Sequence, residues 1–103
     1  MRVIDAAAFR RERAWEALDI ESIDDATVRL HWTDQPYKWH VNDGPEVFVV
    51  LAGEVDMGVR SDDQVETHRL GPGMIFHAEA GDEHVAVPVG EARVLVVERR
   101  GSV

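Results

Sequence analysis

Hydrophobic and polar side chains alternate along most of this chain, a pattern typical of strands that bury one face. Residues 27–33 show it clearly, because Val28, Leu30 and Trp32 lie on one side and polar residues on the other. Residues 46–51 are almost continuously apolar, as expected of a strand covered on both faces. Further strands are predicted at 54–60, 64–70, 74–78, 83–88 and 92–99.

Turn-forming residues separate these segments about every 8–12 positions. The turns are expected at Ala52-Gly53, Ser61-Asp62-Asp63, Gly71-Pro72-Gly73 and Gly81-Asp82. Seven or eight short strands with such spacing predict a sandwich or a barrel. The sequence contains no repeat, low-complexity tract or linker, so we expect one compact all-β unit.

The N-terminal segment has a different character. Asp5 can cap a helix, and the apolar residues that follow it have loosely helical spacing. Residues 5–18 therefore predict a short helix, although an irregular arm fits as well. We divide the chain into an N-terminal arm or short helix, residues 1–26, that packs on a barrel formed by residues 27–103.

Composition narrows the classes of function. A chain of 103 residues, 45% hydrophobic and 30% charged, is long enough for one modest core. Its net charge of −9 repels phosphate, so neither nucleic acid nor an anionic membrane is an expected partner. Without cysteine there is no disulfide framework and no thiolate zinc site. Because no leader-like segment or long apolar run is present, we expect a cytoplasmic location.

Two segments place metal-binding side-chain types where the strand pattern would prefer apolar ones. His40 and Asn42 share strand parity, and the turn after Asn42 can bring Glu46 back beside them. His84 comes from a strand far along the sequence. Imidazole nitrogen and carboxylate oxygen suit Fe, Mn, Ni, Co or Zn, and two histidines with one carboxylate leave positions open for substrate.

The first segment resembles the first motif of the cupin family, commonly written G-x5-H-x-H-x3,4-E-x6-G. It reads His40-x-Asn42-x3-Glu46-x6-Gly53, with Asn42 where the family commonly has its second histidine. The leading glycine of the motif is absent, since Gln35 lies near that place.

The second segment is similar to the second cupin motif, G-x5-P-x-G-x2-H-x3-N. It reads Gly73-x5-Glu79-x-Gly81-x2-His84, with Glu79 in place of the proline and Pro88 at the closing asparagine position. The resemblance covers about residues 28–98.

The resemblance implies a small double-stranded β-helix, or jelly-roll, barrel that is usually dimeric. It also implies a divalent transition metal, either Fe, Mn, Ni or Zn, held inside by the motif residues. His40, Glu46 and His84 fall on family ligand positions, and Asn42 falls on the fourth. An amide oxygen is a weaker ligand than imidazole, so Asn42 lowers the affinity or leaves its position to water. The alternative is a cupin that has lost its ion and keeps the polar residues as a binding cavity.

Two functions stay open at this point. The first is a metal-dependent enzyme acting on a small molecule, with oxygenase-like chemistry favoured over isomerase, decarboxylase or lyase chemistry because the open positions can receive O2 and substrate together. The second is a non-catalytic module that binds or senses a small metabolite. A homodimer is expected, from the resemblance and because a barrel of this size has edge strands and apolar faces to cover.

The remaining histidines receive no catalytic role. His77 is predicted to be a hydrogen-bonded structural residue rather than a proton shuttle. His31 and His68 share strand faces with polar residues and are expected to meet solvent.

Other residues near the motifs are expected to be structural or to border the site. Trp39 should pack against the barrel, and Tyr37 and Lys38 precede the site and are candidates for its mouth. Glu79 and Glu83 are interpreted as solvated turn residues rather than general bases.

Overall fold

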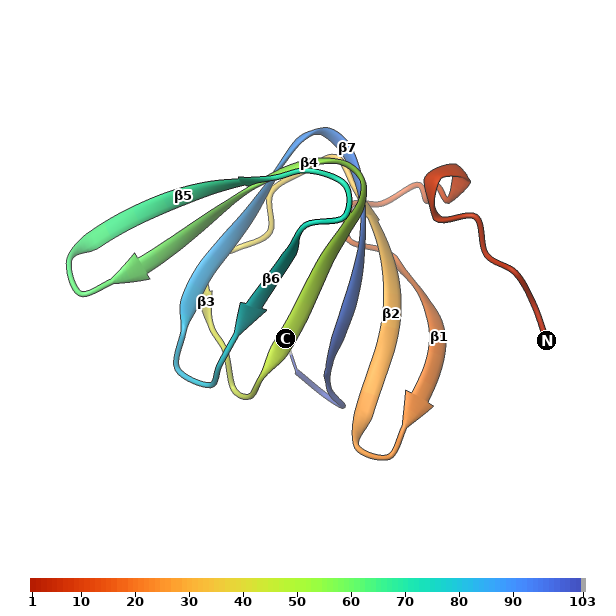
Figure 1. Ribbon diagram of the computed structural model, residues 1–103, viewed down its shortest axis with the longest axis horizontal. Helices are drawn as coiled ribbons and strands as arrows, with labels where there is room; N and C mark the ends of the chain where they lie inside the picture. Colours follow the sequence, from red (N-terminus) through yellow and green to blue (C-terminus); the bar gives the residue numbers. More distant parts are fainter. Residues whose placement is uncertain (103) are drawn as a thin grey trace.

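Seven strands and one turn of 3-10 helix form the fold in the computed structural model, which describes residues 1–102 (Figure 1). In chain order they are η1 (Ala6–Ala8), β1 (Ala17–Ile23), β2 (Ala26–Thr33), β3 (His40–Val41), β4 (Glu46–Ser61), β5 (Gln64–Leu70), β6 (Ile75–Ala78) and β7 (Glu83–Arg99). The predicted all-β class is confirmed. No helix in residues 1–102 has the length and apolarity needed to cross a membrane.

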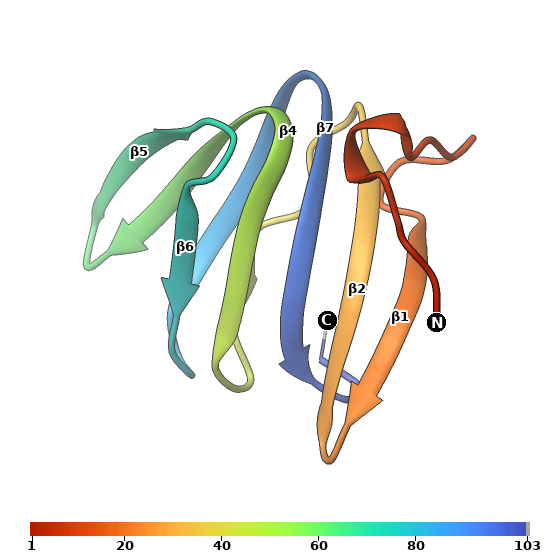
Figure 2. The ribbon, with the colours of Figure 1, turned by 45° about the vertical axis from the view of Figure 1, so that its right-hand side comes forward.

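All strand pairs are antiparallel, and the main path runs β1-β2-β7-β4-β5. The two short strands lie off this path, with β3 paired to β7 and β6 paired to β4. Figure 2 shows β4 and β7 running beside each other through the whole molecule. These two strands therefore connect the two ends of the barrel.

The turn expected at Ala52-Gly53 is wrong, because β4 continues through it. The register against β7 shifts on both sides of Ala52, and Gly53 adopts a φ of 78°. An added Cβ on Gly53 would overlap the carbonyl oxygen of Glu91. Glycine thus bends the strand by a bulge rather than ending it.

The strands predicted at 83–88 and 92–99 are likewise one continuous strand, β7. Gly90 lies between them with a φ of 72°, so the strand bends there without a loop. The strands predicted at 46–51 and 54–60 merge into β4 in the same way. The sequence predicted a reversal at Gly53 and a break between two strands around Gly90.

The N-terminal segment is an arm with a single helical turn. Asp5 caps η1 by accepting a hydrogen bond from the amide of Ala7 at 3.2 Å, but the predicted helix over 5–18 is otherwise wrong. Its last two residues, 17 and 18, already belong to β1, which pairs with β2. The irregular-arm alternative describes residues 9–16. The division of the chain between residues 26 and 27 stays a prediction.

The core lies between the two halves of the bent sheet. It consists of Phe48, Val50, Val55, Met57, Leu70, Ala86, Ala92, Val94 and Val96. Leu30 and Trp32 are also buried. They lie on one face of β2, and Arg29 and His31 lie on the other. The N-terminal arm lies near Trp32, where the guanidinium of Arg10 stacks at 5.5 Å from the indole ring. As a result β2 is covered on both faces.

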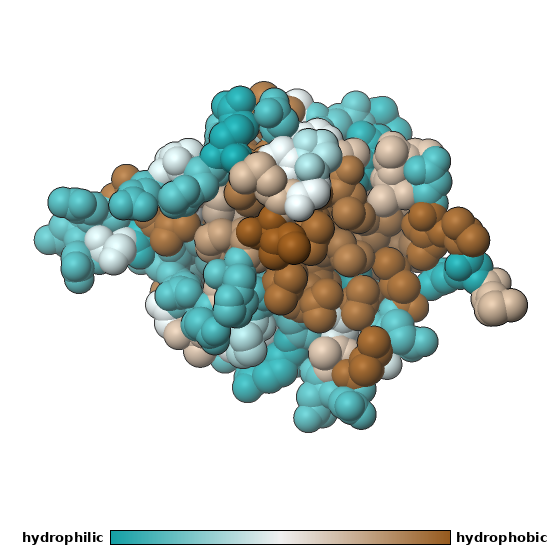
Figure 3. All heavy atoms as spheres, in the orientation of Figure 1, coloured by the Kyte–Doolittle hydropathy of each residue, from teal (hydrophilic) through white to brown (hydrophobic). Residues whose placement is uncertain are grey.

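The outward face of β4, β6 and β7 carries apolar side chains (Figure 3). We define the outer apolar face as Val47, Val49, Ile75, Leu95 and Val97, which the register places opposite one another. Ile75 keeps 62% of its surface exposed, and the other four are half-buried. The alternate side chains of β4 and β7, between those of the outer apolar face, point toward the barrel interior.

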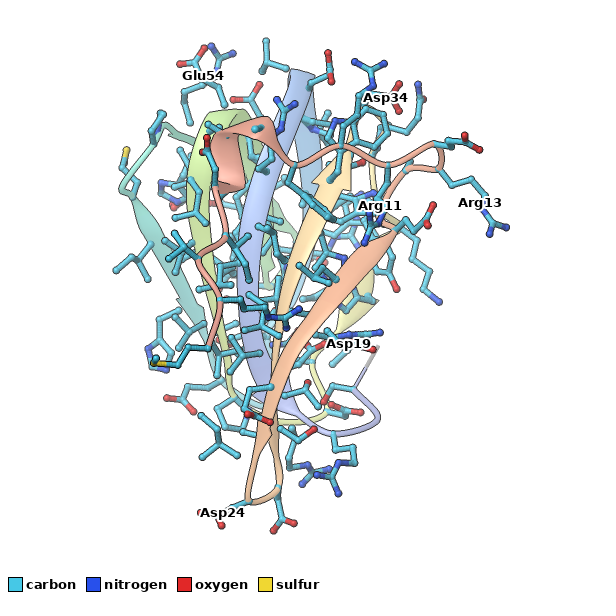
Figure 4. The ribbon with its side chains drawn as sticks, turned by 90° about the vertical axis from the view of Figure 1, so that its right-hand side faces the viewer. Arg11, Arg13, Asp19, Asp24, Asp34 and Glu54 are labelled. Atoms are coloured by element: carbon cyan, nitrogen blue, oxygen red, sulfur yellow. The ribbon has the colours of Figure 1, made fainter. Side chains whose placement is uncertain are left out.

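Charged side chains occupy the ends and edges of the barrel (Figure 4). Asp24, at the tip of the β1–β2 hairpin, has a φ of 52°, which aspartate tolerates better than most residues with a Cβ. Asp62 has a φ of 56° in the β4–β5 turn, where the sequence predicted a reversal at 61–63. That turn is confirmed.

Candidate metal centre

Strand pairing brings the two motif histidines together. His40 on β3 and His84 on β7 are direct partners in the antiparallel register. Residues directly opposite each other share a face, so both imidazoles lie on the same side of the sheet. Their ring centroids are 4.4 Å apart.

Backbone hydrogen bonds fix the turn that joins β3 to β4. The amide of Asn42 donates to the carbonyl oxygen of Asp82 at 2.8 Å, and the amide of Gly81 donates to the carbonyl oxygen of Asn42 at 2.9 Å. These bonds hold the first motif against the turn of the second. Glu46, the first residue of β4, follows at once and turns toward His84.

The predicted ligands converge on one point. One nitrogen of each histidine and one carboxylate oxygen of Glu46 all lie within 4.8 Å of one another. His84 Nε2 lies 3.2 Å from Glu46 Oε1. His84 is 2% exposed and Glu46 is 8% exposed, whereas His40 is half-buried. The cluster is thus largely removed from water but open beside His40.

Asn42 lies within this cluster at the fourth motif position. Its Oδ1 is 2.7 Å from His84 Nε2, and its amide Nδ2 donates to Glu46 Oε1 and to the carbonyl oxygen of Gly44, each at 3.3 Å. These donor bonds orient the amide so that its oxygen faces the imidazole. Asn42 therefore either adds an oxygen to the ligand set or holds the other side chains in place.

The electrostatics of Glu46 favour a metal ligand. Burial alone would raise the pKa of Glu46, but hydrogen bonds from His84 and Asn42 and the nearby imidazoles lower it below its ordinary value. The carboxyl group is consequently ionised at neutral pH. Nδ1 of His84 is buried and has no hydrogen-bond partner among residues 1–102. Two imidazoles, a carboxylate and an amide oxygen are a donor set that fits a divalent transition metal.

A cavity of about 250 Å³ opens beside the cluster. Besides the three predicted ligands, its wall includes Trp15, Tyr37, Phe48, Ala86, Val96, Arg29, His31, Glu98 and Ser102. Apolar walls with a few polar groups are typical of small-molecule sites. Burial, together with the charge of Glu46, raises the pKa of Glu98 to about 7. The cavity therefore combines a polar floor with aromatic and aliphatic walls.

The expectation that His31 meets solvent is wrong. His31 is half-buried and lines the cavity, and its Nδ1 lies 2.8 Å from the carbonyl oxygen of Trp15. Burial lowers the pKa of His31 below its ordinary value, so the ring is neutral at pH 7. A carbonyl oxygen only accepts, so the proton of the neutral ring is on Nδ1. The polar face of β2 faces the cavity, not water.

Trp15 was missed by sequence reasoning, which placed it in a predicted helix. It lies in the arm, and the contacts that bring it to the cavity are with residues distant in the sequence. A local sequence pattern therefore does not predict them. Tyr37, a candidate for the mouth of the site, does line the cavity, whereas Lys38 is not part of its wall.

The other candidates lie outside the cavity. His77 is exposed with its Nε2 3.1 Å from Glu79, and His68 is exposed, as expected, near Glu66. Glu83 pairs with Arg60 at 2.7 Å. None of these side chains belongs to the wall of the cavity.

Trp39 packs on the barrel, as predicted from its place beside the first motif. Its ring lies over Gly58, where an added Cβ would come within 3.3 Å of it. The guanidinium of Arg60 also stacks on the Trp39 ring, 4.3 Å from the ring centroid.

An antiparallel barrel that carries a histidine–glutamate–histidine cluster beside an internal cavity is a cupin-type barrel. The chain belongs to the cupin domain family, whose model matches residues 23–98. A comparison with curated proteins gave no match. The resemblance inferred from the two motifs is therefore confirmed at the level of the family.

Solved structures show the same fold. A cupin-2 domain containing protein from Shewanella frigidimarina is 23% identical, with a TM-score of 0.77 over 87% of this chain and 85% of that one. Hydroxypropylphosphonic acid epoxidase from S. wedmorenis is 18% identical, with a TM-score of 0.64 over 72% of this chain and 43% of that one. A structure described as Fe(II)-HppE with an alternative substrate is also 18% identical, with a TM-score of 0.63 over 72% and 42%.

Proposed function

We propose that this cupin is a metal-dependent enzyme that acts on a small molecule in the barrel cavity. His40, Glu46 and His84 are the proposed ligands of a divalent transition metal, either Fe, Mn, Ni or Zn. The observation that carries the proposal is the convergence of three donor atoms within 4.8 Å, beside a cavity of about 250 Å³. A structural site would close all four positions, whereas this donor set leaves room for a substrate.

When bound, such an ion supplies Lewis acidity, and as iron it also supplies redox chemistry. The chain's own residues prepare the site. The low pKa of Glu46 keeps its carboxylate ionised, and Asn42 orients that carboxylate through its amide hydrogen. Phe48 and Val96 exclude water from the neighbouring wall.

Oxygenase-like chemistry is the reaction class that we favour over isomerase, decarboxylase or lyase chemistry. Two histidines and one carboxylate leave positions for O2 and a substrate together. An Fe(II)-containing structure and an epoxidase among the proteins of similar fold support this choice. The location in the cytoplasm, expected from the sequence, stays a prediction.

A non-catalytic binding module is the second candidate. The observation in its favour is that Nε2 of His84, the amide of Asn42 and the carboxylate of Glu46 already lie within hydrogen-bond distance of one another without an ion. The cavity would then bind a metabolite directly, with the polar cluster as its floor.

Metal analysis of native-sequence protein, grown with Fe, Mn, Ni and Zn present, tests the proposal. About one equivalent of a single transition metal is expected. Glu46→Gln, which keeps the size of the side chain, and His40→Ala should each lose most of it. His77→Ala, an exposed histidine outside the cavity, is the matched control and should retain the metal.

Functional assays separate the two candidates. Substrate-dependent O2 uptake that disappears in Glu46→Gln supports an oxygenase. A protein without metal that is stabilised thermally by small molecules supports the binding module. Equal metal content in the native protein and in Glu46→Gln would contradict the ligand assignment.

A further inference from the structure

The cavity has an aromatic wall contributed in part by the N-terminal arm. Trp15 and Tyr37 meet edge to face with ring centroids 5.4 Å apart, and Tyr37 meets His40 in the same way at 5.3 Å. The three rings therefore run from the arm to the proposed metal ligands, and all three line the cavity. A ligand held at the ligand cluster has these ring surfaces beside it.

Trp15 is held in an unusual backbone conformation. Its φ is 66°, in the left-handed region that a bulky side chain rarely adopts. Figure 2 shows the chain between η1 and β1 passing beside the end of β2. Strain of this kind persists only where the surroundings impose it, and it gathers at functional sites.

Three hydrogen bonds impose this conformation. The amide of Trp15 donates to the carbonyl oxygen of Trp32 at 2.8 Å, and its carbonyl oxygen accepts from Nδ1 of His31 at 2.8 Å. The indole Nε1 donates to the carbonyl oxygen of Gln35 at 2.9 Å. The ring is thus anchored at both its backbone and its polar edge, which leaves its faces for packing. His31 acts as a positioning residue for this wall.

Away from the ligand cluster, the charges of the cavity wall disfavour an anionic group on the ligand. Arg29 is the one arginine or lysine in the wall among residues 1–102, and it is already paired with Asp19 at 2.6 Å. Glu98 is an acidic residue of this wall, and the net charge of the chain is −9. Beyond the ligand cluster, where the proposed divalent ion would supply positive charge, an anionic group on the ligand would meet an acidic wall with no free arginine or lysine.

We propose that Trp15 and Tyr37 select a small molecule with a flat, uncharged aromatic or unsaturated part and a metal-binding oxygen group. This inference rests on the proposed function, because the oxygen group is placed at the ligand cluster. The cavity volume of about 250 Å³ is below the usual range of drug-sized pockets, so the ligand is about the size of one substituted ring. Trp15 lies outside residues 23–98, the segment matched by the family model.

Two hydroxamates with the same chelating group provide the test. Benzohydroxamic acid carries a phenyl ring and acetohydroxamic acid a methyl group. Binding to the zinc-loaded protein is measured by calorimetry, and binding in EDTA by NMR. We expect the benzo compound to bind about tenfold more tightly, a ratio that corresponds to about 1.4 kcal/mol and is within the range of an aromatic contact plus its buried area.

Variants assign this ratio to the wall. Trp15→Leu should reduce it to about twofold, while Trp15→Phe keeps most of it. Phe9→Leu, an aromatic residue of the same arm outside the cavity, should leave it unchanged. If Trp15→Leu does not fold, as judged by thermal melting, Tyr37→Leu provides the same measurement.

The outcomes separate the two proposals. A ratio near one in the native protein, or a ratio unchanged in folded Trp15→Leu, overturns the aromatic wall. A preference that persists in EDTA while no metal binds supports the wall and contradicts only the proposed metal centre. Binding of 4-carboxybenzohydroxamic acid at least as tight as that of benzohydroxamic acid would overturn the inference that the flat part of the ligand is uncharged.

Discussion

His40 and His84 are direct partners across the β3–β7 pair, with their rings 4.4 Å apart. Because the side-chain period of a strand is two, a shift of register by one residue would turn one imidazole to the opposite face. The two backbone hydrogen bonds of Asn42 to the turn at 81–82 hold this register. The proposed metal centre therefore depends on the pairing of a strand that is only two residues long.

Asn42→Asp is expected to tighten metal binding and weaken the metal-free protein. The change is isosteric, and it adds a charged oxygen 2.7 Å from His84 Nε2. A further carboxylate should increase the affinity for a divalent ion roughly tenfold or more. Without an ion the new carboxylate faces Glu46 and loses the amide donor, which should cost about 1–3 kcal/mol. Competition with a chelator and urea unfolding in EDTA measure the two effects.

The two effects must appear together. Asn42→Ala is the control, since it removes the oxygen without adding charge. Metal affinity that is the same in Asn42→Asp and Asn42→Ala would show that this position does not face the ion.

The ligand residues could be predicted because their chemistry and spacing are visible in the sequence. His40, Glu46 and His84 are polar types at strand positions where apolar residues are expected, and the structure brings them together. His31 and Trp15 could not be predicted in the same way. Alternation along β2 reveals two faces, but not that the arm covers one and the cavity the other. The left-handed conformation of Trp15 has no sequence signature.

Two glycines offer a matched test of the bent strands. At Gly53 the φ is 78° and an added Cβ meets the carbonyl oxygen of Glu91, whereas at Gly90 the φ is 72° and no atom lies within 4 Å of the added Cβ. Gly90→Ala should therefore cost about 1–2 kcal/mol from backbone strain alone. Gly53→Ala should cost about 3 kcal/mol or more. Urea unfolding curves of both variants give the comparison, and equal losses would contradict the close approach at Gly53.

These glycines also mark the limit of strand prediction from the sequence. A glycine between two apolar runs suits a reversal and a bulge equally well, and only the partner strand decides between them. In β4 and β7 each partner continues past the glycine, so the strand bends and stays paired. The strands predicted at 27–33 and 64–70 were correct because neither segment contains a glycine at which the chain could reverse or form a bulge.

His31 should make the stability of the metal-free protein depend on pH. Burial lowers the pKa of His31 in the folded state. Below about pH 6.5 its imidazole is therefore protonated more readily in the unfolded chain than in the folded protein. Stability from this group is fully present above pH 6.5 and is lost as the pH falls toward the lowered folded pKa. The charged neighbours that modify the shift are Arg29, which lowers the pKa, and Glu46 and Asp19, which raise it.

His31→Asn provides the measurement. Asparagine keeps an N–H near the position of Nδ1, so the bond to Trp15 can persist while the titration is removed. Between pH 7.5 and 5.5, in EDTA, the urea midpoint of the native protein should fall more than that of His31→Asn. Parallel curves would mean that His31 titrates normally in the folded state.

A homodimer through the outer apolar face is our prediction for the assembly. This face spans β4, β6 and β7, and a two-fold axis would set it against its own copy (Figure 3). Ile75→Lys places a charge at its most exposed position and should shift the mass seen by light scattering from two chains to one. Val65→Lys, on the distant β4–β5 hairpin, is the control and should leave the dimer intact. A native protein with the mass of one chain at micromolar concentration would contradict the prediction.

Ser102 lines the cavity, and its hydroxyl donates to Asp43, within the first motif, at 2.7 Å. A segment fused shortly after Ser102 would therefore start near the proposed metal ligands. A C-terminal polyhistidine tag would supply competing imidazoles at the entrance and distort both metal content and ligand affinity. Met1 is fully exposed, which makes the N-terminus the end for purification handles and immobilisation on a sensor surface.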